Sequence, residues 1–111
     1  MKTEQPSFTT SVLASGSDLV ALRFVGLTGA VTAAGAKALG VCAADTLVGK
    51  LSPVHVTGVL LATAGAAITA GTEIEATATG KAIAKTTGAS NGFALDAATA
   101  DGDVIRIVRG I

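Results

Sequence analysis

Large aromatic side chains are nearly absent from the sequence. It contains no tryptophan, no tyrosine and three phenylalanines among 111 residues, whereas alanine and glycine are abundant. A single domain of this composition buries little apolar area per residue. Each Å² of apolar area that is buried contributes about 25 cal/mol of stabilisation. In small scaffolds this gain is close to the entropic cost of ordering the chain. We expect association with further protein to supply part of the missing stabilisation.

The chain also has one cysteine, Cys42, and one histidine, His55. A lone thiol excludes an internal disulfide, and this pair falls short of the ligand set of a structural zinc site. Any triad or Cys–His pair would have to use His55, which lies between valines in an alternating stretch. We interpret His55 as a solvent-face or interface residue and Cys42 as a small buried hydrophobe. The sequence thus favours a non-enzymatic protein without catalytic residues, cofactor or metal.

Charge is scarce as well. Charged residues make up 14% of the chain, with eight of each sign and a formal net charge of zero, against about 25% in ordinary globular domains. Without a basic surplus the chain lacks the electrostatic footprint of a nucleic-acid binder. The N-terminal residues have no apolar signal region, and the uncharged stretch 56–72 is shorter than a bilayer span. We expect synthesis in the cytoplasm, no nucleic-acid or membrane partner, and an oligomer or docked subunit.

Short alternating segments between glycine-containing turns predict an all-β, or mostly β, fold. The clearest strand is 104–109 after the Asp101-Gly102 turn, with Ile105 and Ile107 facing the core and Arg106 facing the other way. A hairpin is predicted to turn at 79–81. Further strands are predicted at 19–25, 39–43, 54–59, 73–77, 82–85 and 93–95.

Residues 1–17 are rich in serine and threonine and contain Pro6, with Phe8, Val12 and Leu13 as apolar anchors. This composition predicts an extended N-terminal arm able to reach a neighbour. Residues 18–111 then form a single β-rich domain.

The sequence contains no complete motif for phosphate binding, calcium binding or carboxylate catalysis. The Gly80-Lys81 pair has Glu75 where a phosphate-binding loop needs glycine, and alanine follows the lysine. The aspartates around 96–103 lack the ligand order of a calcium loop. Alternation places Ile74 toward the core and both Glu73 and Glu75 toward solvent, where a solvated face explains them better than a catalytic carboxylate pair.

The order and turn spacing of the C-terminal two-thirds resemble the capsid decoration, or cement, proteins of tailed bacteriophages. The segments that carry the resemblance are 66–74, 79–82, 91–98 and 104–107. It implies a small β-barrel or β-sandwich that forms homotrimers on the outer capsid surface of the virion and clamps neighbouring major capsid protein subunits. A trimer would supply the burial that the thin core lacks.

The expected contact residues are Phe8, Val12 and Leu13 in the arm, with Arg106 and Arg109 as polar anchors to the capsid or to another protomer. Three alternatives remain open. The chain could be a tail or baseplate subunit, a carrier or adhesin module with a functional Lys81, or a small hydrolase or isomerase that uses His55.

Overall fold

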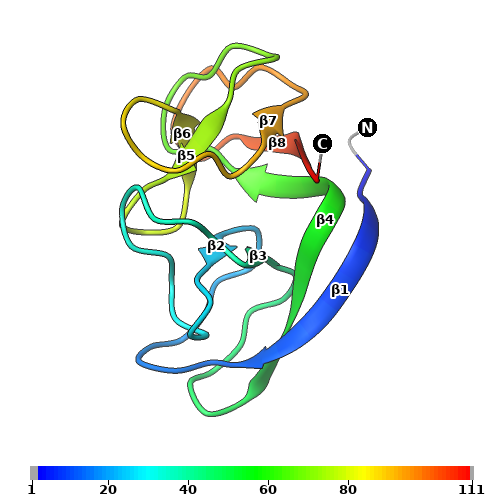
Figure 1. Ribbon diagram of the computed structural model, residues 1–111, viewed down its shortest axis with the longest axis vertical. Coiled ribbons are helices and arrows are strands. Elements are labelled where there is room, and N and C mark those ends of the chain that lie inside the picture. Colours follow the sequence, from blue (N-terminus) through cyan, green and yellow to red (C-terminus); the bar gives the residue numbers. More distant parts are fainter. Residues whose placement is uncertain (1–2, 111) are drawn as a thin grey trace.

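The computed structural model describes residues 3–110, which form eight strands and no helix (Figure 1). Residues 1–2 of the predicted arm and residue 111 of the predicted domain lie outside the described residues. The strands are β1 (Gln5–Leu13), β2 (Phe24–Val25), β3 (Gly40–Cys42), β4 (Leu51–Thr63), β5 (Ile74–Ala76), β6 (Ala82–Ala84), β7 (Phe93–Ala94) and β8 (Val104–Arg109).

Six strands form one antiparallel sheet around the long strand β4. The order is β2-β3-β4-β8-β7, and β1 also pairs with β4. The first half of β4 lies between β1 and β3, whereas its second half, from Gly58 to Thr63, pairs with β8. Figure 1 shows β4 bending between these halves, so that the sheet curls. This curled sheet confirms the all-β prediction and is consistent with the small-barrel alternative.

Gly58 occupies the point where β4 changes partners. Its φ is +107°, a conformation that only glycine adopts readily. A Cβ at this position would collide with the β1 backbone at Pro6, 2.9 Å away. The pairing of β1 with β4 is irregular at the same place, between Pro6 and Thr9. Glycine therefore permits both the bend of β4 and the close approach of β1.

The predicted N-terminal arm forms strand β1 instead of a separate extension. It pairs with β4 along most of its length, as Figure 1 shows. Two side-chain hydrogen bonds add to this pairing, one between Ser7 Oγ and Thr57 Oγ1 (2.8 Å) and one between Thr9 Oγ1 and His55 Nδ1 (2.9 Å). A detached arm is not shown within residues 3–110, because the backbone of this segment has a partner in its own chain.

The core is small and consists of two clusters. The larger one packs Phe24, Leu60, Ile74, Ile105 and Ile107 among alanines, and all five side chains are fully buried. The smaller one contains Leu19, Val25, Val54 and Cys42. Cys42 is buried as predicted, and its Sγ lies 2.8 Å from the Ala44 carbonyl oxygen. The buried Ile105 and Ile107 confirm the predicted inner face of β8.

The predicted strand over 19–25 is mostly wrong, because only Phe24 and Val25 pair as a strand. Leu22 has a φ of +66°, which breaks the extended conformation before the strand begins. Its N–H donates to the Cys42 carbonyl oxygen (2.8 Å), and Leu19 makes an isolated bridge with Thr46. The prediction for residues 19–25 relied on hydrophobic character alone. In the folded chain, most of this segment is a turn that leads into the pairing with β3.

The outward orientation predicted for Glu75 is also wrong. The β5–β6 hairpin forms as predicted, with Ile74 buried and Glu73 exposed, but Glu75 is 7% exposed. The 86–88 loop covers this second face of β5. Glu75 Oε1 accepts hydrogen bonds from the Thr86 N–H (2.6 Å), the Thr86 hydroxyl (3.1 Å) and the Gly88 N–H (3.3 Å). The Thr86 backbone bond does most to lower the pKa of Glu75, which burial by itself would raise.

We expect Leu60→Ala to lower the free energy of unfolding by about 2–5 kcal/mol, because it opens a cavity in a core with few large side chains. Chemical denaturation measures the change. Leu95→Ala is the matched control, since Leu95 is 43% exposed, and it should change stability by no more than about 0.5 kcal/mol. Equal effects of the two variants would contradict the assigned core.

We expect Glu75→Gln to lower the melting temperature at neutral pH and to flatten its dependence on acid pH. The pKa of Glu75 is lowered from 4.5 in the folded chain, so its stabilisation is complete above that value and is lost as pH falls through the folded pKa. Thermal melts between neutral pH and about pH 3 measure this. Glu73→Gln, on the exposed face, is the control. Parallel pH profiles for the wild type and Glu75→Gln would overturn the assignment.

Candidate interaction surface

Large aliphatic side chains are exposed at the end of the molecule where β1 finishes and β4 begins. Leu27 is 72% exposed, Leu51 69% and Leu47 65%, values unusual for leucines in a chain with so small a core. We call this surface the apolar end and define it by six residues: Leu13, Val20, Leu27, Leu47, Val48 and Leu51.

Backbone hydrogen bonds hold the segments of the apolar end together. Leu13 on β1 is paired with Leu51 on β4, so both side chains emerge on the same side of the sheet. The 47–50 turn is tied to β1 through Ala14, whose N–H donates to the Lys50 carbonyl (2.9 Å). The 26–29 turn is tied to the same stretch through Ser15, whose N–H donates to the Gly29 carbonyl (3.2 Å). Figure 1 shows these loops gathered at the lower end of the molecule.

Two aspartates fix the loops from which the apolar side chains project. Asp18 Oδ1 accepts the Val48 N–H (2.8 Å), and Asp45 Oδ1 accepts the Ala21 N–H (2.8 Å). Both aspartates line a shallow pocket of about 320 Å³ together with Val20 and Leu47. The carboxylates therefore serve as loop caps, and they order the apolar side chains without covering them.

Strand β1 adds an uncharged edge to this surface. Its nine residues, Gln5–Leu13, include no charged side chain, and seven of them are exposed. Natural edge strands are commonly protected by lysine, proline or a bulge. Here Pro6 and the nearby pairing irregularity protect only the first part of the strand. The rest of β1, residues 9–13, is open to a partner, and Phe8 is 56% exposed within the irregular part.

The five contact residues predicted from the sequence do not form one patch. Phe8 and Leu13 are exposed on β1, but Val12 is partly buried against the smaller core cluster. Arg106 and Arg109 lie on β8, which pairs with the other half of β4. Of the five, Leu13 alone belongs to the apolar end.

Both arginines are engaged within the chain. Arg106 makes a bidentate contact with Asp96, from Nε to Oδ2 (3.0 Å) and from Nη2 to Oδ1 (2.9 Å). These bonds raise the pKa of Arg106. Arg109 donates to three backbone carbonyls, those of Ala38, Leu39 and Val56. The positions of Arg106 and Arg109 on a predicted strand do not reveal these partners, because the partners approach the arginines only in the folded chain.

The sequence prediction missed five residues of the apolar end: Val20, Leu27, Leu47, Val48 and Leu51. A signal for all but Val20 exists in the sequence, because Gly26-Leu27-Thr28-Gly29 and Leu47-Val48-Gly49-Lys50 place large aliphatic side chains in glycine-containing turns. Turns normally lie at the surface and carry polar residues. A leucine in such a turn is therefore expected to be exposed, and several of them near one another indicate a contact surface.

The residues considered for chemistry are held apart or engaged elsewhere. His55 is paired with Val41, whereas the next pair is Cys42 with Val54, so the His55 and Cys42 side chains lie on opposite faces of the sheet. Lys81 forms an ion pair with Asp101 (2.9 Å). Within residues 3–110, no three His, Cys, Asp or Glu side chains are grouped to hold a metal ion. The same residues contain no helix long and apolar enough to cross a membrane.

The fold and surface define a small β-sheet module with a thin core and an exposed apolar end. The family model described as phage cement protein matches residues 3–109, nearly the whole chain. The chain therefore belongs to the phage cement protein family and is a structural protein of the phage head.

A solved structure shares the fold. The N base of head fiber gp8.5 of bacteriophage phi29 superimposes with a TM-score of 0.75 at 19% sequence identity, over 91% of this chain and 92% of that chain. No curated protein sequence matches the chain. At this identity the likeness establishes the common architecture alone.

Proposed function

We propose that this protein decorates the outer surface of a phage head as a homotrimer and reinforces the contacts between major capsid protein subunits. The observation that carries the proposal, beside family membership, is the apolar end. A chain with a thin core leaves five leucines exposed, four of them at this end. Burying one leucine side chain contributes about 1.5–3 kcal/mol, so covering this surface supplies stabilisation that the monomer lacks.

A neutral chain suits repeated docking on a coat. With eight acidic and eight basic residues, the protein has no net attraction to packaged DNA and little electrostatic repulsion between its own copies. Three linked copies raise the effective concentration of each contact for the next, so weak individual contacts add up to firm attachment. Trimer formation and capsid attachment then explain how a small domain stabilises a much larger shell.

The contact residues proposed here begin with the apolar end and continue along β1. Leu13 belongs to both surfaces, and Phe8 extends the contact toward the start of the strand. Val12 supports β1 from the inner side, where it packs on the smaller cluster. Arg106 is a candidate polar anchor because its side chain stays 38% exposed beside Asp96. The structure that shares this fold is described as the N base of a phage head fiber.

The test is co-sedimentation of the purified chain with empty phage heads, together with its solution mass by light scattering. We expect the wild type to be a trimer that binds heads. The double variant Leu47→Ser/Leu51→Ser should bind at least about tenfold more weakly, since it removes two apolar contacts. Its unfolding free energy should stay close to the wild-type value, because both side chains are exposed in the free chain.

Leu95→Ser is the control for this experiment. Leu95 is an exposed leucine next to β7, away from the apolar end, and its replacement should leave head binding unchanged. A wild-type chain that stays monomeric and ignores heads would refute the proposed function. Equal head binding by the double variant and the control would refute the role of the apolar end.

A further inference from the structure

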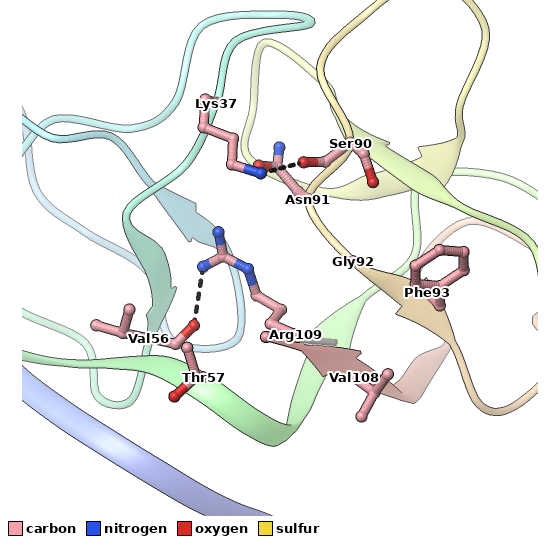
Figure 2. A pocket seen from close by; sticks show the side chains of 10 residues that line it. Lys37, Val56, Thr57, Ser90, Asn91, Gly92, Phe93, Val108 and Arg109 are labelled. Atoms are coloured by element: carbon pink, nitrogen blue, oxygen red, sulfur yellow. Dashed lines mark hydrogen bonds between the residues drawn. The ribbon is translucent and has the colours of Figure 1, made fainter.

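A second pocket lies where the bend of β4 meets the end of β8. Its volume is about 270 Å³, and two of its lining residues, Lys37 and Arg109, are basic while none is acidic. Figure 2 shows both side chains extending into this region from different parts of the chain. Val56, Phe93 and Val108 form apolar parts of the wall. The pocket thus combines two cations with apolar sides.

The Arg109 guanidinium is held by backbone carbonyls and keeps unused donors. Nη1 donates to the carbonyls of Leu39 (2.8 Å) and Val56 (3.1 Å), and Nη2 donates to that of Ala38 (2.9 Å). Three of its five N–H donors are then engaged, and Nε donates to no described residue. Nε and Nη2 lie on one edge of the guanidinium group, and Nη2 keeps a second N–H beside the one that Ala38 accepts. This edge has the geometry that grips both oxygens of a carboxylate.

Lys37 is positioned in a similar way. Its Nζ donates to the Ser90 carbonyl oxygen (2.6 Å), which leaves further ammonium N–H donors for a ligand. The buried Asn91 ties the Lys37 segment to the other wall, because its Oδ1 accepts the Ala38 N–H (2.9 Å) and its Nδ2 donates to the Ala36 carbonyl (3.0 Å). The Arg109 guanidinium is therefore fixed before any ligand arrives, which lowers the entropic cost of binding, whereas the exposed Lys37 ammonium is held by one hydrogen bond.

The charge of this pocket is not compensated by the described residues. Within residues 3–110, Lys81 pairs with Asp101, Arg106 pairs with Asp96, and His55 Nε2 lies 3.6 Å from Glu4 Oε2. Neither Lys37 nor Arg109 takes part in an ion pair within the same residues. Burial lowers the pKa of Arg109, which reflects the cost of holding its charge away from water. An anion in the pocket would offset both this cost and the repulsion between the two cations.

We propose that this pocket binds a carboxylate, with the Nε–Nη2 edge of Arg109 donating two parallel hydrogen bonds and Lys37 supplying the second charge. Its source is an acidic side chain of the capsid subunit beneath the protein. Pockets for whole small-molecule ligands measure about 300–1,000 Å³, and this one, at about 270 Å³, suits a single side chain whose methylene groups contact the apolar wall. The carboxylate site stands on the pocket alone, whereas its capsid source rests on the proposed function.

The first experiment uses acetate as the probe and the full chain without heads. The side-chain Nε–H resonance of Arg109 is followed by NMR while acetate replaces chloride at constant ionic strength. We expect a saturable shift, weakened about threefold or more in Lys37→Gln and unchanged in Lys81→Gln. Arg109 itself is left intact because its guanidinium supports three carbonyls. No saturable shift, or equal shifts in the two variants, would overturn the site.

The second experiment identifies the source of the carboxylate. Lys37→Glu places an acid beside Arg109 and should weaken head binding at least about tenfold, whereas Lys81→Glu should have little effect. If acetate binds to the wild type and Lys37→Glu binds heads as tightly as the wild type does, the capsid source is overturned. A free small carboxylate is then indicated as the ligand. Because the acetate titration contains no heads, failure of the wild type to bind heads would refute the proposed function separately from the site.

Discussion

The change of partners along β4 is the constraint on which the rest of the structure depends. One continuous strand, Leu51–Thr63, pairs with β1 and β3 in its first half and with β8 in its second. The positive φ of Gly58 allows the bend between these halves. The apolar end lies at the start of β4, the basic pocket lies at the bend, and Leu60 lies in the core beyond it. Both proposed contact sites and the core are therefore placed by a single element.

The distribution of leucine explains why such a fold suits an assembled protein. Within residues 3–110, five leucines are largely exposed and two, Leu19 and Leu60, are fully buried. The core instead uses alanine between a few large side chains, which allows close packing but buries little area. Several exposed leucines beside an alanine-rich core are expected when part of the hydrophobic stabilisation comes from a partner.

Local sequence patterns predicted the turns and the best strand. The Asp101-Gly102 turn, the turn at Gly80 and the alternation of β8 depend on neighbouring residues, and the structure confirms them. Local patterns could not predict contacts between residues that are far apart in the sequence. Glu75 is buried because a loop more than ten residues later covers it, and Arg109 bonds carbonyls 53 to 71 residues away. Alternation identifies the faces of a strand but not what packs against them.

The orientation of the protein on a phage head tests the central claim most directly. Cryo-electron microscopy of heads saturated with the chain would give that orientation. The account predicts density on the outer surface, with Leu47, Val48 and Leu51 at the start of β4 turned toward the capsid shell or toward a neighbouring copy. Density in which these side chains face solvent, or heads that carry no added density, would contradict it.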